Sequence, residues 1–130
     1  MAIHSRASFL AGAACGFLTV ALGAFGAHAL RPYLSERFYA VWQTGVEYLG
    51  VHGVVLLVIA LLPANAWSRA AGGLIAAGVA LFSGSLLLMA GLNVPALGMV
   101  TPLGGVTLLA GWAAVAGYGL GVRGSGSRLE

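Results

Sequence analysis

Apolar and polar residues alternate along this chain in long blocks rather than in short periods. Four apolar stretches occupy about residues 8–30, 44–62, 70–92 and 103–122, and short polar or proline-containing connections separate them. Each stretch approaches or exceeds the roughly 20 residues that an α-helix needs to cross about 30 Å of hydrocarbon. The pattern therefore predicts an all-α integral membrane protein, built as a four-helix bundle.

The connections predict where the helices begin and end. Pro32 ends the first helix, because proline removes a backbone donor and disfavours a helical conformation in the residue before it. Ser35 is a suitable N-cap and Glu36 places a negative charge in the first turn, so the second helix starts almost at once. Residues 37–43 mix charged and aromatic side chains, as is typical of the headgroup region, so we expect this helix to start in the outer interface. The other connections are expected at residues 63–69 and 93–102.

Small residues predict how the helices pack. They recur at alternating spacings of three and four in the first, third and fourth stretches, a pattern that indicates left-handed packing and close backbone approach. The second helix instead carries Thr44, Tyr48 and His52 on one face. We expect the close contacts to involve Gly12, Gly16, Gly23, Gly26, Gly84, Gly104 and Gly111.

Composition and charge agree with a membrane location. Hydrophobic residues make up 60% of the chain and charged residues 7%, and the formal charge of +3 comes from arginines near segment ends, so we expect lipid partners and no nucleic acid. Arg6, Arg69 and Arg123 outnumber Arg31 and Arg37, so the positive-inside rule predicts that both termini are cytoplasmic.

The chain is expected to form one domain, residues 1–123. Residues 124–130 read Gly-Ser-Gly-Ser-Arg-Leu-Glu, which is typical of a flexible linker or an appended tail. Small residues on three helices would also permit self-association into a homo-oligomer.

Two ionisable residues lie at depth in the second span. At 1.5 Å per residue, Glu47 is about 7 to 8 Å below Trp42, and His52 is about 15 Å below it, near the bilayer midplane. Ionisable side chains inside a membrane are costly unless they are paired or hydrated, so both residues are candidates for a functional site.

Polar residues concentrate in the outer half of the predicted bundle. We therefore expect an outward-facing polar pocket, closed on the cytoplasmic side by apolar packing. Its candidate residues are His28, Gln43, Glu47, Tyr48, His52, Ser83, Ser85 and Thr101.

Each candidate also has a purely structural interpretation. Glu47 could form an ion pair with Arg31, Arg37 or protonated His28, or direct its carboxylate toward the interface. His52 could hydrogen-bond to Ser83, Ser85 or a backbone carbonyl. His28 could simply bind water, headgroups or the carboxylate at a helix end.

Signatures of catalysis are missing from the sequence. It has no nucleophile elbow, zinc-protease motif or glycine-rich phosphate loop. The spacing of His28 and His52 does not support a closed metal site. We therefore expect a non-enzymatic protein with no cofactor and no metal.

Four local patterns carry a family resemblance: residues 23–30 (GAFGAHAL), residues 43–48 (QTGVEY) with His52, residues 81–86 (LFSGSL), and residues 101–106 (TPLGGV) with Gly111 and Trp112. In this order and spacing they resemble the YgdD-like membrane family, also called domain of unknown function 423. The resemblance implies a four-span protein of the bacterial inner membrane.

Three functions remain open from the sequence. The first is a pocket that binds a small polar or amphiphilic ligand, a lipid or a partner helix. The second is a small-solute or proton-coupled transporter or channel in which Glu47 and His52 titrate. The third is a structural assembly factor, which predicts a pocket filled by the protein's own side chains.

Overall fold

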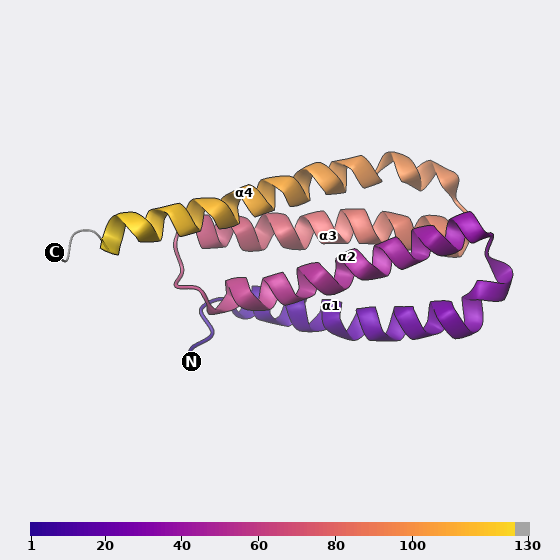
Figure 1. Ribbon diagram of the computed structural model, residues 1–130, viewed down its shortest axis with the longest axis horizontal. Coiled ribbons are helices and arrows are strands. Elements are labelled where there is room, and N and C mark those ends of the chain that lie inside the picture. Colours follow the sequence, from indigo (N-terminus) through magenta and orange to yellow (C-terminus); the bar gives the residue numbers. More distant parts are fainter. Residues whose placement is uncertain (127–130) are drawn as a thin grey trace.

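The computed structural model describes residues 1–126, with side chains for residues 1–122, and within that part it is all-helical (Figure 1). The long helices are α1 (Arg6–Phe25), α2 (Glu36–Leu61), α3 (Ala66–Leu92) and α4 (Thr101–Gly126). A π-helical turn, η1 (Gly26–Leu30), and two 3₁₀ turns, η2 (Arg31–Tyr33) and η3 (Pro95–Met99), complete the elements. The fold prediction is confirmed: the structure has four helices long and apolar enough to cross a membrane.

The helices lie roughly antiparallel, with α2 and α3 in the centre and α1 and α4 on the outside. α1 packs mainly on α2, α2 on α3, and α3 on α4, whereas α1 and α3 touch only sparsely. The N-terminal residues and the last described turn of α4 lie at the same end of the bundle, which we call the terminal end (Figure 1). The handedness of the packing stays a prediction.

Side-chain caps set the helix starts. The Ser35 hydroxyl accepts a hydrogen bond from Phe38 N at 3.1 Å, with Glu36 in the first turn of α2, as predicted. α3 begins earlier than predicted, because Asn65 and Ser68 form a reciprocal capping box. Trp67, Ser68 and Arg69 therefore belong to the first turn of α3 and not to the connection. α4 continues to Gly126, and residues 127–130 of the predicted tail lie outside the described residues.

The end of α1 carries a specific contact with α2. The Trp42 indole nitrogen donates to the Leu22 carbonyl oxygen at 3.0 Å, just before the chain changes to the π-helical turn. Gly26 makes this possible, because a Cβ at that position would collide with the Trp42 ring. Gly26 therefore fixes how closely α1 and α2 approach at this end.

Other glycines bring helices together along the bundle, but not all those expected. A Cβ at Gly12 would lie 2.7 Å from the Gly53 carbonyl oxygen, and Cβ atoms at Gly104 and Gly111 would collide with Phe82 and Ile75. A Cβ at Gly23 would make only an ordinary contact. Cβ atoms at Gly16 and Gly84 would meet nothing within 4 Å, so a packing role for these two stays a prediction.

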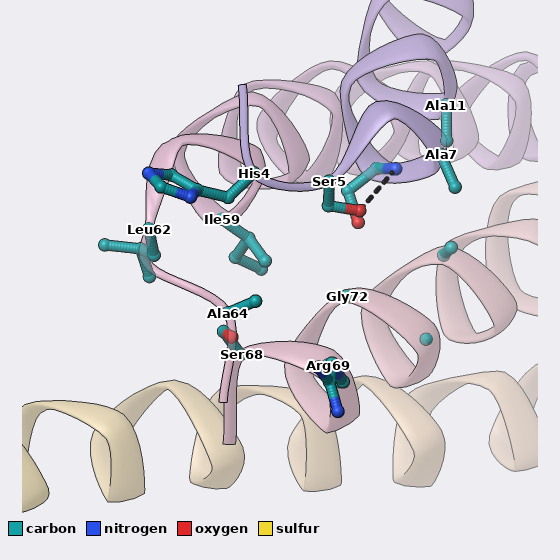
Figure 2. Close-up of a pocket in the computed structure, with 13 residues that line it drawn as sticks. His4, Ser5, Ala7, Ala11, Ile59, Leu62, Ala64, Ser68, Arg69 and Gly72 are labelled. Atoms are coloured by element: carbon teal, nitrogen blue, oxygen red, sulfur yellow. Dashed lines mark hydrogen bonds between the residues drawn. The ribbon is translucent and has the colours of Figure 1, made fainter. Parts of the chain in front are cut away.

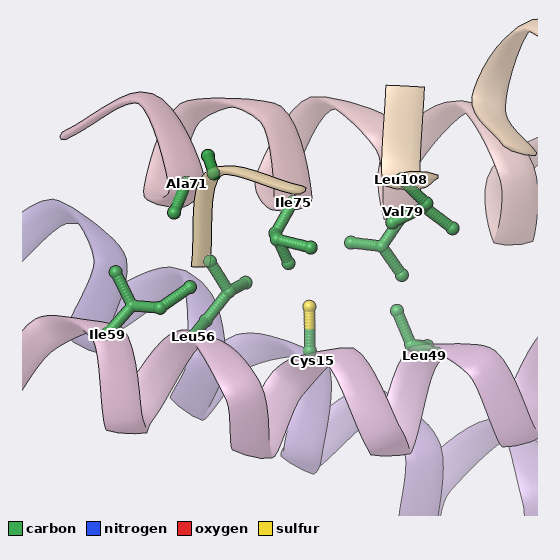
Figure 3. Close-up of a cluster of buried hydrophobic side chains, with 9 residues drawn as sticks. Cys15, Leu49, Leu56, Ile59, Ala71, Ile75, Val79 and Leu108 are labelled. Carbon is green, nitrogen blue, oxygen red and sulfur yellow. The ribbon is translucent and has the colours of Figure 1, made fainter. Parts of the chain in front are cut away.

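The sequence analysis expected close backbone contacts for the first, third and fourth helices only, but α2 makes them as well. Gly45 and Gly53 are buried on α2, and Gly53 lies against Cys15 of α1. An apolar core fills the space between the helices (Figure 3). It runs from the middle of the bundle toward the terminal end. Its buried members are Cys15, Leu49, Leu56, Ile59, Ala71, Ile75, Val79, Leu108 and Ala114.

Candidate ligand-binding groove between α2 and α4

A half-open groove of about 570 Å³ runs between α2 and α4 over Phe82 of α3. This volume lies within the range of about 300 to 1,000 Å³ that is usual for small-molecule sites. Most of its lining is apolar or aromatic, and Glu47 supplies a carboxylate. The lining residues are Glu47, Tyr48, Val51, His52, Phe82, Gly105, Leu108, Leu109 and Trp112.

His52 forms the floor of the groove and is 4% exposed. Its Nδ1 lies 2.8 Å from the Tyr48 carbonyl oxygen, which can only accept, so Nδ1 carries the proton. The Trp112 indole nitrogen donates to Nε2 at 3.1 Å. Both ring nitrogens of the neutral imidazole are therefore satisfied, by a backbone carbonyl as one interpretation expected, but not by Ser83 or Ser85.

Aromatic rings surround this histidine. The Tyr48 ring stacks on the imidazole with centroids 5.7 Å apart, and it contacts the Phe82 ring at 4.4 Å. The Trp112 ring meets the imidazole edge-on at 5.9 Å. These contacts join α2, α3 and α4 and fix the shape of the groove.

Glu47 lies exposed on α2, at the rim of the groove. Among residues 1–122 its carboxylate has no ion-pair partner within 4.0 Å, so the pairing expected with Arg31, Arg37 or His28 is not seen. The Arg31 guanidinium instead lies 4.9 Å above the Tyr39 ring. Glu47 also borders a smaller hollow of about 200 Å³ beside Trp42 and Gln43.

The structure does not gather the eight predicted pocket residues into one site. Glu47, Tyr48 and His52 share the groove, whereas Gln43 lines only the smaller hollow. His28 lies exposed on the π-helical turn.

Ser83, Ser85 and Thr101, which were also predicted for the pocket, do not line the groove. Ser85 and Thr101 share a hydrogen bond of 2.6 Å between their hydroxyls, which ties α3 to the start of α4. Ser83 is 1% exposed, and its hydroxyl has no hydrogen-bond partner among the described residues.

Sequence reasoning missed three groove residues that decide its shape, Phe82, Leu109 and Trp112. Phe82 and Trp112 do lie in the family patterns, and Trp112 lies 11 residues after Thr101, about 16 Å along α4. That depth matches the depth of His52, but depth does not tell which way a side chain points.

The groove is closed toward the terminal end. Leu56 and Ile75 follow below His52, both fully buried, in the apolar core shown in Figure 3.

The sequence itself identifies relatives of this fold. A family described as "Protein of unknown function (DUF423)" matches residues 22–105, well over half of the chain. The chain belongs to this family. The matched DUF423 range contains Glu47 and His52, and Trp112 lies beyond it.

Curated DUF423 relatives are named as membrane proteins. A UPF0382 membrane protein of Staphylococcus haemolyticus is 39% identical over 67% of this chain and 73% of its own length. YwdK of Bacillus subtilis is 40% identical over 67% of this chain and 74% of its own. YgdD of Escherichia coli, an inner membrane protein, is 39% identical over 66% and 68%. No solved structure matches the chain. With four membrane-spanning helices, this DUF423 member is an integral membrane protein.

Proposed function

We propose that this protein is a non-enzymatic inner-membrane protein that binds an amphiphile with a positively charged headgroup in the groove between α2 and α4. One observation carries the proposal: an unpaired carboxylate, Glu47, lies at the rim of a half-open groove lined with aromatic and aliphatic side chains. A carboxylate facing lipid is costly without a partner, and a cationic headgroup would supply one.

The shape and chemistry of the groove fit such a ligand. An alkyl chain would lie against Val51 and Leu109, while the headgroup would sit between the Glu47 carboxylate and the Tyr48 ring, where a cation also gains from the ring face. Because the groove is open on one side, the ligand would enter laterally from the bilayer.

The two other interpretations have less support. A proton-coupled path would need His52 to exchange protons, yet both its nitrogens are engaged and Leu56 and Ile75 follow it without polar atoms. A structural assembly factor should have this space filled, and the groove of about 570 Å³ is open.

The test uses the purified protein in phosphatidylcholine nanodiscs, with a long-chain alkylamine brominated along its tail as a quencher of tryptophan fluorescence. The same brominated chain ending in a carboxylate is the comparison ligand. Glu47→Gln removes the charge and keeps the size. Glu36→Gln is the matched control, because Glu36 lies at the start of α2 and does not line the groove.

We expect the amine to quench at lower concentration than the carboxylate. Glu47→Gln should weaken amine binding roughly fivefold, which corresponds to about 1 kcal/mol, and Glu36→Gln should leave it unchanged. Equal quenching by amine and carboxylate, or equal effects of the two substitutions, would overturn the proposal.

A further inference from the structure

A second cavity, of about 520 Å³, lies at the terminal end between the first turns of α1 and α3, far from the groove (Figure 2). In Figure 2, His4, Ser5, Ala7 and Ala11 lie on one side, and Ser68, Arg69 and Gly72 on the other. We propose that this cavity binds the phosphate headgroup of an anionic membrane phospholipid, with the start of an acyl chain between α1 and α3.

The mouth of the cavity is cationic. Arg69 and His4 line it, and no acidic residue does. The acidic residues within the described part of the chain, Glu36 and Glu47, both lie on α2, at its start and before its middle, toward the opposite end of the bundle. Within residues 1–122, no acidic side chain lines the cavity beside Arg69, so a phosphate would meet a positive charge that these residues do not compensate.

Helix geometry adds to this charge. α1 and α3 both begin at the cavity, so the partial positive ends of two long helices face the same space. The preceding segment is fixed in place, because the backbone nitrogens of His4 and Ser5 donate to the Ala60 carbonyl oxygen at 2.8 and 3.1 Å. The wall of the cavity is therefore built by the fold rather than by a free N-terminus.

A hydroxyl without a partner marks the inner part of the cavity. Ser8 is 9% exposed and lines the cavity, and its side-chain oxygen makes no hydrogen bond within residues 1–122. The oxygen lies against Gly72, where an added Cβ would approach it to 2.6 Å. This hydroxyl is therefore free to donate its proton to a phosphate oxygen.

The deeper lining suits a lipid better than a free anion. One turn farther along α1 and two turns farther along α3, Ala11 and Ala76 replace the polar residues, and Ile59 lies between the helices. Gly73 faces open space there, because a Cβ on it would meet nothing within 4 Å. The sparse contact of α1 with α3 thus leaves room for an acyl chain below the headgroup position.

The test measures bound lipid by native mass spectrometry, on the full chain in detergent with equal amounts of phosphatidylglycerol and phosphatidylcholine. Arg69→Gln removes the charge that lines the cavity. Arg6→Gln is the matched control, because Arg6 lies at the same end of the bundle but does not line the cavity. Gly73→Leu adds a side chain to the cavity lining where a Cβ meets nothing within 4 Å, and Gly16→Leu adds the same side chain to a glycine outside the cavity whose Cβ also meets nothing.

We expect one phosphatidylglycerol to bind in preference to phosphatidylcholine. Arg69→Gln should weaken this binding about fivefold, as expected for one arginine near a headgroup, and Gly73→Leu should abolish it. Both control variants should bind normally.

Equal losses of phosphatidylglycerol binding in Arg69→Gln and Arg6→Gln would indicate a general attraction of the lipid to the positively charged surface and would overturn the proposed site. Equal binding of the two lipids would overturn its charge preference. Glycerol phosphate binding as tightly as the lipid would overturn the role of the acyl chain. Because this cavity shares no residue with the groove, failure of either proposal leaves the other standing.

Discussion

The Trp112 indole nitrogen donates a hydrogen bond to the His52 Nε2 at 3.1 Å, joining α4 to α2 across 60 residues of sequence. α4 otherwise packs mainly on α3, and α2 packs on both α1 and α3, so this bond connects the two walls of the groove directly. In hydrocarbon neither partner would find water if the bond were lost, and the imidazole would keep a buried acceptor without a donor.

Trp112→Phe should therefore destabilise the bundle by about 1 kcal/mol, the size of a typical interhelical hydrogen bond in a membrane. Trp67→Phe is the control, because Trp67 is exposed and its indole nitrogen makes no hydrogen bond within residues 1–122. Unfolding in mixed micelles with increasing dodecyl sulfate, followed by circular dichroism, measures both.

A double-mutant cycle isolates the bond from the loss of ring volume. In a His52→Leu background, Trp112→Phe should cost clearly less than it does in the original chain. The same cost in both backgrounds would mean that the hydrogen bond contributes nothing measurable.

Gly26→Ala should destabilise the protein by about 1 to 3 kcal/mol, because the added methyl group forces the Trp42 ring away and breaks its bond to the Leu22 carbonyl oxygen. Gly16→Ala adds the same methyl group to α1 at a position where a Cβ meets nothing within 4 Å. It should be neutral or slightly stabilising, since alanine favours a helix more than glycine does. Thermal unfolding in detergent compares the two variants, and equal melting temperatures would contradict the packing described for Gly26.

Two neighbouring serines of α3 should respond in opposite ways to alanine. Ser85→Ala loses the bond of 2.6 Å to the Thr101 hydroxyl and should cost about 1 kcal/mol. Ser83→Ala removes a buried hydroxyl that has no partner among the described residues, so it should be neutral or stabilising. The same unfolding titration measures both. A large loss in Ser83→Ala would show that its hydroxyl is bonded in the membrane.

The fold was predictable because its signals are local. Four apolar stretches of spanning length fix the number of helices, and Ser35 with Glu36 fixes the start of α2. The signal of Asn65 and Ser68, which form a capping box, is local too, but residues 63–69 were all assigned to the connection, so the start of α3 was placed too late.

The packing was less predictable, because spacing places residues on a common face without telling which neighbour that face meets. Gly16 and Gly84 follow the same spacing as Gly12 and Gly104, yet they face open space. In the same way, the depth of His52 followed from counting residues, whereas its bond to Trp112 depends on the rotation of α4 about its axis.

The orientation in the membrane rests on a small difference in charge and is open to a direct test. In a Cys15→Ala background, a cysteine at Ala2 and a cysteine at Tyr33 report opposite ends of the bundle, since both residues are exposed. With both termini in the cytoplasm, a membrane-impermeant maleimide added to intact cells should label Tyr33→Cys, and it should label Ala2→Cys only after lysis.

Arg69→Gln tests whether the arginines set this orientation. Arg128 of the predicted tail is not counted here. The variant then keeps Arg6 and Arg123 at the terminal end, equal in number to Arg31 and Arg37 at the other end. If loop charge sets the orientation, this variant should insert in both directions, and both cysteines should become partly labelled in intact cells. Unchanged labelling in Arg69→Gln would mean that another feature, such as the helix order or a partner, fixes the topology. If Ala2→Cys alone were labelled in intact cells that carry the original Arg69, both termini would lie outside the cytoplasm.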